Sequence, residues 1–338
     1  MALGKRITRH RFDPEIVKQV RSLYGLDNWH GPLALLTDYV VIALAITACV
    51  QLGWIAYPFA VIVIGSRQRA LATITHEASH RTLMKHTRLN DILGSYLSGY
   101  LIGMLFHAYQ ESHVKSHHGQ FGHEEDDADY KYMRDMGVYD DCSQARYTWN
   151  ILIRPLLLLR LPSYLGFLIR DRLMAIRSEE GKREAVRLAL FWSALIAAIT
   201  YFGLAWEFVL YWVIPFLTAF QIIGWYIELS EHAPMMDTGL DIHMSRNRNS
   251  HWCELALTGI HGESFHLAHH LWARVPFWRM NQLNKILRQD PDYRAHDDRC
   301  GGILLSSNGA PSVVALLSRI KLDRGMMSGS APEARLGA

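Results

Sequence analysis

The sequence predicts an all-α integral membrane protein, in which four transmembrane helices form two hairpins under a helical cap on the cytoplasmic side. Three observations predict this class: four long apolar stretches, a very short link within each pair of them, and Lys and Arg residues gathered on one side of the pairs. A membrane-spanning helix needs about 20 mostly apolar residues. The mean hydropathy of +0.01 is therefore an average over apolar spans and polar segments.

The composition argues against several other classes. Half of the 338 residues are hydrophobic, which excludes a disordered chain, and 4 Cys are too few for a disulfide scaffold. The 35 Lys and Arg are nearly balanced by 32 Asp and Glu, giving a net charge of +3. Without a basic stripe, nothing indicates a nucleic-acid partner.

The four expected spans come in two pairs. They are Leu33–Leu52 with Trp54–Ile74, linked at Gly53, and Leu188–Trp206 with Phe208–Ile227, linked at Glu207. Such short links force hairpins, so both ends of each pair lie on one side of the membrane. The alternative is a large soluble helical protein, but long uncharged runs with aromatic residues toward their ends favour membrane helices.

Lys and Arg lie before the first span, after the second and before the third, and the two links have none. The positive-inside rule then places both termini and the segment between the hairpins in the cytoplasm, in a bacterial inner membrane. We expect a cytoplasmic segment at 1–32, a membrane domain at 33–287 and a cytoplasmic tail at 288–338. The apolar segments Ile92–Phe106 and Ile151–Ile169 are short or interrupted, and we expect them to be interfacial or re-entrant.

The 18 His residues are clustered, eight between His76 and His123 and seven between His232 and His270. They form four motifs: His76-Glu-Ala-Ser-His80, His113-Val-Lys-Ser-His117-His118, Glu228-Leu-Ser-Glu-His232 and His266-Leu-Ala-His269-His270. Residues three or four apart share one face of a helix, which suits metal ligation. Nine candidate ligands follow: His76, His80, His113, His117, His118, His232, His266, His269 and His270. Nine are too many for one metal ion and suit two.

Other interpretations of the His residues stay open. His76-Glu77-x-x-His80 is the HExxH pattern of zinc proteases, in which Glu77 would be the general base. A metal transporter would place charged or His residues within the spans. For the remaining clustered histidines, a role without metal is the simpler interpretation.

The set of motifs resembles the membrane fatty acid desaturase and hydroxylase superfamily. The segment from Gln110 to Gly119 looks like its second His motif with flanks, and Phe265 to Pro276 looks like its third. The resemblance extends over roughly Leu33 to Leu287. It implies that the nine histidines bind two iron ions, which use O2 to remove hydrogen from an unactivated C–H bond or to insert oxygen into it.

Three carboxylates near the motifs are further candidates, either as ligands or as groups that orient ligands. Glu228 precedes His232 by four residues, where desaturases of animal type often have Asn, so Glu228 would bind iron or support the site. Glu77 and Glu263 would accept the second N–H of a His ring. Asp127 and Glu231 are further candidates for this role, whereas most of the acidic run 124–129 is expected to be solvated surface.

The expected substrate is a fatty-acyl lipid or an acyl chain on a carrier, which would be desaturated. A hydroxylase of the same superfamily, acting on a lipid or another small metabolite, is the alternative, and a membrane zinc protease is a remote one. The resemblance also implies an external electron donor, a ferredoxin or a cytochrome-type protein, and contact with membrane lipids.

Overall fold

The computed structural model describes residues 7–321, and of residues 167, 168 and 171–175 it describes the backbone alone. This part of the chain is all-helical, with two isolated β-bridges and no strand. In chain order the α-helices are α1 (Pro14–Arg21), α2 (His30–Leu52), α3 (Tyr57–Ser79), α4 (Thr87–Gly94), α5 (Phe106–Gln110), α6 (Ala128–Asp135), α7 (Gln144–Tyr147), α8 (Arg154–Leu156), α9 (Leu161–Ala175), α10 (Glu179–Tyr201), α11 (Ala205–Phe208), α12 (Ile214–Leu217), α13 (Ala219–His232), α14 (Trp252–Thr258), α15 (His266–Leu271), α16 (Met280–Leu287), α17 (Pro291–Asp297) and α18 (Val313–Leu317).

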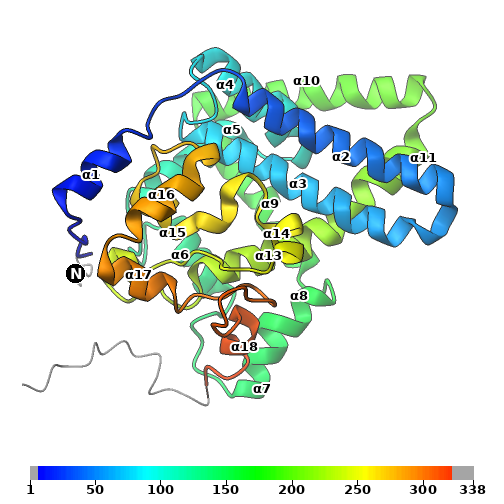
Figure 1. The fold of residues 1–338 in the computed structure, drawn as a ribbon. Helices are drawn as coiled ribbons and strands as arrows, with labels where there is room; N and C mark the ends of the chain where they lie inside the picture. The colour runs from blue at the N-terminus through cyan, green and yellow to red at the C-terminus, as the bar shows by residue number, and fades with distance from the viewer. Residues whose placement is uncertain (1–6, 322–338) are drawn as a thin grey trace, which may run out of the picture.

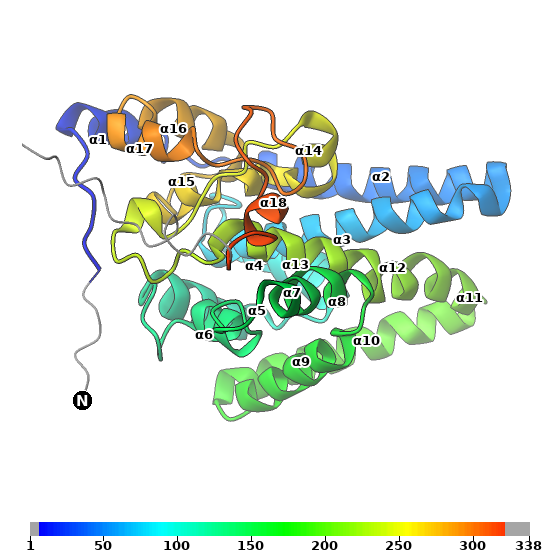
Figure 2. The ribbon, with the colours of Figure 1, turned by 90° about the horizontal axis from the view of Figure 1, so that it is seen from below.

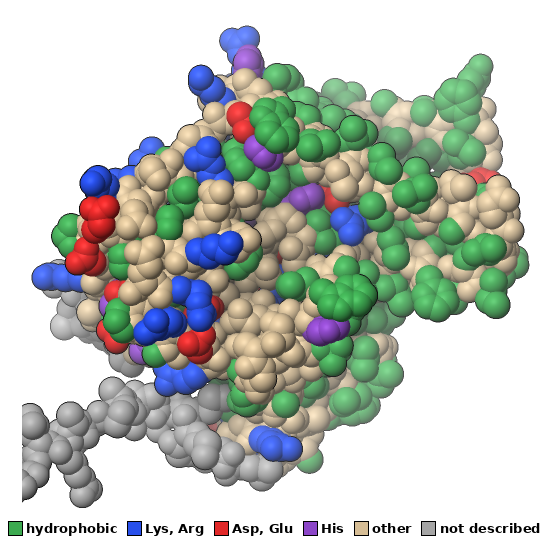
Figure 3. Space-filling view, in the orientation of Figure 1, with side chains coloured by type: hydrophobic (Ala, Val, Ile, Leu, Met, Phe, Trp, Pro, Cys, Tyr) green, Lys and Arg blue, Asp and Glu red, His purple; other side chains and the backbone are tan. Residues whose placement is uncertain are grey.

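Three helical segments are long and apolar enough to cross a membrane: His30–Ile55, Glu179–Tyr201 and Ala205–His232. They correspond to α2, α10 and the run from α11 to α13, and together with α3 they extend to one side of the molecule (Figures 1 and 2). Many of their apolar side chains are exposed, for example Leu44, Val50 and Leu190. This end of the molecule is largely free of charged side chains, whereas the opposite end has many (Figure 3). The distribution matches a membrane-embedded part and a polar part.

The expected second span, Trp54–Ile74, lies in α3 but is not among these three segments. The inner half of α3 is core: residues from Gly65 to Ser79 are mostly buried by other helices. Its charged side chain Arg67 lies 3.3 Å from the fully buried Asp38 of α2. We therefore describe α3 as a helix that packs against α2 and α13, and it is joined to α2 by a turn at Gly53 with φ of 69°.

The link between the second pair of helices lies four residues before the expected position at Glu207. The chain turns at Phe202–Leu204, because Gly203 adopts a left-handed φ of 70°, and Glu207 is already in α11. The two segments expected to be interfacial or re-entrant contain short helices and part of α9, and neither contains one of the three candidate spans.

The polar part consists mainly of α1, α6 and α14–α18 (Figure 2). Residues 288–321 pack onto the rest of this part, since Tyr293, Asp297 and Val313 are buried. The remainder of the expected tail, 322–338, and the first six residues lie outside the described part.

The helices α3 and α13 approach each other closely at Gly65. A Cβ atom there would lie 2.6 Å from the Ala219 Cβ and 2.7 Å from the Phe220 backbone nitrogen. Small residues let membrane helices approach this closely.

We predict that Gly65→Val lowers the unfolding free energy by roughly 1–3 kcal/mol, as overpacking generally does. Thermal unfolding followed by circular dichroism in detergent measures this. Gly224→Ala on α13 is the matched control, because its Cβ would meet no atom within 4 Å. Equal stability of the Gly65→Val variant and the unchanged protein would contradict the packing described here.

Candidate metal centre

Four elements bring the nine candidate histidines together in one buried region. The last turn of α3 provides His76, and His80 follows as its cap. The π-helix η4 (Glu111–His118) provides three, α13 ends on His232, and α15 provides the last three. The structure therefore assembles all nine from segments separated by almost two hundred residues.

The histidines form two groups. The first His group is His76, His80, His113, His118 and His269, and the second His group is His117, His232, His266 and His270. In each group the nitrogen atoms lie within 4.8 Å of one another.

The helix type of η4 decides this division. We expected His113 and His117 to share a face, as residues four apart do on an α-helix. In a π-helix the hydrogen bonds run from i to i+5, so the turn is wider. Accordingly His113 and His118 point into the first His group, while His117 points into the second.

The first His group has the unsatisfied nitrogens expected of a metal site. The Nε2 atoms of all five imidazoles are buried and have no hydrogen-bond partner in the described structure. The rings of His76 and His269 lie 4.4 Å apart between centroids, and those of His80 and His118 lie 4.6 Å apart. Buried polar atoms without partners are costly, and a shared metal ion would satisfy all five.

The second His group has distances that fit coordination of one ion. The Nε2 atom of His266 lies 2.8 Å from that of His232 and 3.0 Å from that of His270. The Nε2 atom of His270 lies 3.2 Å from that of His117. Two nitrogens bound to one ion at about 2.1 Å lie about 2.8–3.4 Å apart at angles of roughly 84–109°. The residues thus fit a metal ion in both groups.

The protonation equilibria favour neutral imidazoles, the form that binds metal. Burial and neighbouring imidazoles lower the pKa of His113, His118 and His269 well below the ordinary value, and burial lowers the pKa of His80 to about 4. His117 differs. Burial lowers its pKa, but the carboxylates of Asp129 and Asp127 outweigh burial and raise it to about 9.

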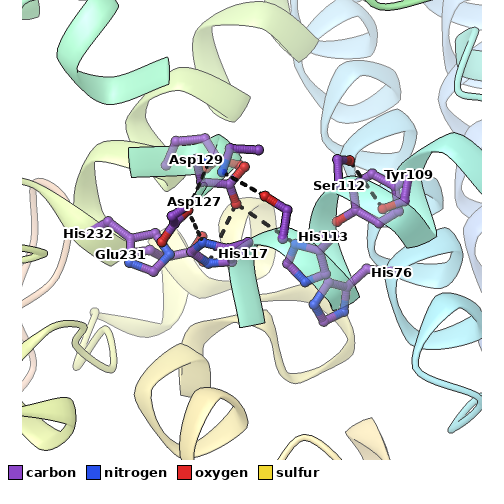
Figure 4. Close-up of polar contacts among 12 residues, drawn as sticks. His76, Tyr109, Ser112, His113, His117, Asp127, Asp129, Glu231 and His232 are labelled. Atoms are coloured by element: carbon purple, nitrogen blue, oxygen red, sulfur yellow. Dashed lines mark hydrogen bonds and ion pairs between the residues drawn. The ribbon is translucent and has the colours of Figure 1, made fainter. Parts of the chain in front are cut away.

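Carboxylates contact the Nδ1 atoms of two of these histidines, His117 and His76, and orient their rings. The Nδ1 atom of His117 lies 2.8 Å from Asp127 Oδ1 (Figure 4). Asp127 is fully buried, accepts the Gly122 N–H at 2.7 Å and caps α6. The Nδ1 atom of His76 lies 3.2 Å from Glu77 Oε1. Such partners orient a ligand ring and leave its other nitrogen for the metal.

Glu77 accepts two further hydrogen bonds, from Thr82 Oγ1 at 2.9 Å and from the Phe277 N–H at 3.2 Å. Burial raises the pKa of its carboxyl to about 7 despite these bonds. The Thr82 hydroxyl and the Phe277 N–H hold the Glu77 carboxylate in place. This carboxylate lies beside His76 Nδ1, whereas the unpartnered nitrogen of His76 in the first His group is Nε2. This arrangement differs from the HExxH protease, in which the Glu activates a metal-bound water.

Glu228 and Glu263, the other two carboxylates named from the sequence, flank the buried Arg69. Arg69 Nη2 lies 2.7 Å from Glu263 and 3.4 Å from Glu228. Neither carboxylate belongs to a group of potential metal ligands in the described structure. Arg69 and the fully buried Arg248, which lies 3.6 Å from Glu231, were not singled out in the sequence. No sequence motif around Arg69 or Arg248 indicates that either residue belongs to the site.

Asp129 is a functional candidate that sequence reasoning missed, since it ends a run that resembles a solvated surface. Its Oδ2 lies 3.5 Å from His117 Nε2 and 3.8 Å from His113 Nδ1, so the carboxylate lies between the two His groups (Figure 4). It offers one more oxygen donor beside the second His group, which has four imidazoles against five in the first.

A cavity of about 520 Å³ opens beside the His groups. Its inner wall includes His76, His113 and His269, and its outer wall includes apolar residues such as Met104, Leu158 and Phe220. Gly224 and Glu228, one helical turn apart on α13, also line it. A pocket of this size suits a small organic substrate.

We predict that Asp127→Asn lowers the affinity for metal about 10- to 100-fold, as loss of an outer carboxylate generally does. Asn keeps the oxygen that caps α6, so the local fold is retained. Metal content measured during titration with a chelator tests this, with the exposed Glu125→Gln as the control. An unchanged chelator midpoint would contradict the orienting role of Asp127.

Comparison with known proteins identifies the family of the chain. A profile described as fatty acid desaturase matches residues 52–300. A curated protein, dihydrorhizobitoxine desaturase of Bradyrhizobium elkanii, is 37% identical over 314 residues, which are 91% of this chain and 89% of that relative. The range matched by the profile, residues 52–300, spans the positions of all nine histidines. The chain therefore belongs to the fatty acid desaturase family and is an oxidoreductase.

Proposed function

We propose that this protein is an O2-dependent non-haem diiron desaturase, with one iron ion in each His group. The observation that carries the proposal is the convergence of five and four buried imidazole nitrogens on two points. Bound iron would supply the oxidising power that an unactivated C–H bond requires, because acid–base groups cannot attack such a bond. The family is generally diiron, and imidazole is a suitable ligand for iron.

The electron balance defines what else the reaction needs. Removal of two hydrogen atoms from a C–C unit supplies two electrons, and reduction of O2 to two water molecules consumes four. An external donor must supply the other two electrons. A ferredoxin or a cytochrome-type protein stays our prediction for this donor, as does the cytoplasmic orientation of the site.

The protein residues have three roles in this proposal. Asp127 and Glu77 hold the rings of His117 and His76 in fixed orientations. The cavity brings a substrate carbon next to the first His group. Tyr109, stacked on His113 at 5.1 Å between centroids, covers one side of that ring and lines the same cavity.

The fatty-acyl substrate expected from the sequence stays a prediction. The apolar outer wall of the cavity would suit an acyl chain, but the inner wall is charged. The name of the relative specifies dihydrorhizobitoxine and mentions no fatty acid. The alternative, a hydroxylase of the same superfamily acting on a lipid or another small metabolite, also stays a prediction.

Metal content tests the core of the proposal. We expect two iron ions per chain in the protein purified after expression with iron. His269→Ala removes a ligand of the first His group and His232→Ala one of the second, so each variant is expected to retain about one ion and to lose desaturation. Iron analysis with Mössbauer spectroscopy measures this. One zinc ion per chain in the unchanged protein would overturn the proposal.

Gly224 tests the cavity as the substrate site. A side chain at this position would extend into open space, so Gly224→Phe is expected to fill the cavity without disturbing the helix. We expect at least a tenfold loss of kcat/KM with unchanged iron content, on the order of 1.4 kcal/mol in transition-state binding. The smaller Gly224→Ala is the control. Full activity of Gly224→Phe would place the substrate elsewhere.

A further inference from the structure

We propose that Asp38 and His261 are positioning residues of the metal centre. Their contact holds the segment before α15 against α2 and α3, and it thereby fixes the three histidines that α15 provides. Both residues act through the backbone of the 3-10 helix η8 (Ile260–Phe265), which leads directly into α15. This role rests on the proposed function, because it concerns the geometry of the two His groups.

Asp38 is a charged residue at a position where membrane helices rarely have one. It lies in α2, within the candidate span His30–Ile55, and its side chain is fully buried. Ionisable residues within spans are rare and pair with polar groups inside the protein. Asp38 has two such partners, Arg67 Nη1 at 3.3 Å and His261 Nε2 at 2.7 Å. A carboxylate only accepts hydrogen bonds, so Nε2 of His261 carries the hydrogen.

Two backbone carbonyls before η8 accept hydrogen bonds from neighbouring residues of α3. Ser66 Oγ donates to the Leu257 carbonyl at 2.7 Å, and Arg67 Nη2 donates to the Ala256 carbonyl at 3.3 Å. Arg67 therefore contacts Asp38 and the backbone of α14 with the same guanidinium group. The end of α14 is thus fixed to α3, the helix that also provides a ligand of the first His group.

His261 adopts a backbone conformation that is unfavourable for a residue other than glycine. Its φ is 56°, in the left-handed region, and Gly262 continues the kink with a φ of 74°. Such a conformation is uncommon for other residues and persists where the surrounding structure holds it. The hydrogen bond to Asp38 is a restraint of this kind, because it holds the side chain of the strained residue itself.

The kink is linked to candidate ligands of both His groups. α15 begins five residues after His261 and provides three histidines, which are divided between the two groups. The His261 ring also packs edge-to-face on the Phe277 ring, at 5.4 Å between centroids. The Phe277 N–H donates to Glu77, which contacts the ring of His76. A displacement of His261 is therefore expected to shift ligands in both groups.

A contribution to stability alone is the competing explanation for this contact. Loss of a buried hydrogen bond lowers the stability of a protein wherever the bond lies. By itself, such a loss leaves the arrangement of the ligands in the folded molecules unchanged. A positioning role instead changes this arrangement, so the spectrum of the bound iron distinguishes the two explanations.

Three substitutions of His261 test the positioning role. His261→Phe keeps a ring beside Phe277 but has no donor for Asp38. His261→Asn suits the left-handed backbone, since Asn tolerates a positive φ, but its amide ends short of the Nε2 position. His261→Gln has the same amide with one more methylene, which restores a donor to Asp38. The readouts are the Mössbauer spectrum of the iron-loaded, detergent-purified full chain and its chelator midpoint, both without substrate.

We expect His261→Phe and His261→Asn to change the quadrupole splitting of the bound iron and to lower the chelator midpoint about 3- to 30-fold. His261→Gln should return both readouts to those of the unchanged protein. The Asn variant keeps the test decisive if the Phe variant does not fold.

His10→Phe is the matched control. Nε2 of His10 lies 3.0 Å from Asp290 Oδ2, and its ring packs edge-to-face on Phe12 at 4.7 Å between centroids. The substitution thus removes a His–Asp contact of the same kind outside the two His groups. It should lower the thermal stability and leave the spectrum and the chelator midpoint unchanged.

Three results would overturn the positioning role. The first is an unchanged spectrum and chelator midpoint in the His261→Asn variant. The second is an equal change in His10→Phe, and the third is a His261→Gln variant that stays as altered as His261→Asn. A preparation of the unchanged protein that binds no iron would instead refute the proposed function, so the two failures are distinguishable.

Discussion

Nine imidazoles turned inward from four separate elements are the constraint on which the rest of the structure depends. The Nε2 atoms of the five imidazoles in the first His group are buried and have no hydrogen-bond partner among the described residues. Such an arrangement is unfavourable for the protein alone. Bound metal ions would make the contribution of these nitrogen atoms to the folding free energy favourable. Folding of the site and metal binding are therefore coupled. The same ions would connect α3, η4, α13 and α15.

The neutral ligands explain why so many carboxylates surround the site. Imidazoles bring no negative charge to a metal ion, so the compensating charge must come from further out. The Asp127 carboxylate provides negative charge at Nδ1 of His117, and the Glu77 carboxylate provides it at Nδ1 of His76. Asp129 adds a carboxylate between the two His groups, 3.8 Å from His113 Nδ1 and 3.5 Å from His117 Nε2. Glu228 lines the cavity and lies 3.4 Å from Arg69.

The histidines of the site could be predicted from the sequence, because ligand spacing on a helix is a local property. His76 and His80, for example, are four residues apart and belong to the same His group. The division into two groups was not predictable, since it depends on η4 being a π-helix, which residue spacing does not indicate. Likewise α3 has the length of a span, but its burial arises from packing against α2 and α13. The network of Arg69 with Glu263 joins residues 194 positions apart, and no local pattern marks it.

Neighbouring histidines in two helices, the π-helix η4 and the α-helix α15, connect the two His groups. His117 and His118 are consecutive, yet His117 belongs to the second His group and His118 to the first. α15 repeats the arrangement, with His269 in the first group and His270 in the second. Two pairs of neighbouring residues therefore connect the sites through rigid peptide units. A shift of η4 or α15 moves ligands of both groups together, so the separation of the two metal positions is set by the backbone. Metal ions held by these residues would supply the oxidising chemistry, and the peptide units shared by neighbouring ligands in η4 and α15 would keep the two His groups at a fixed spacing.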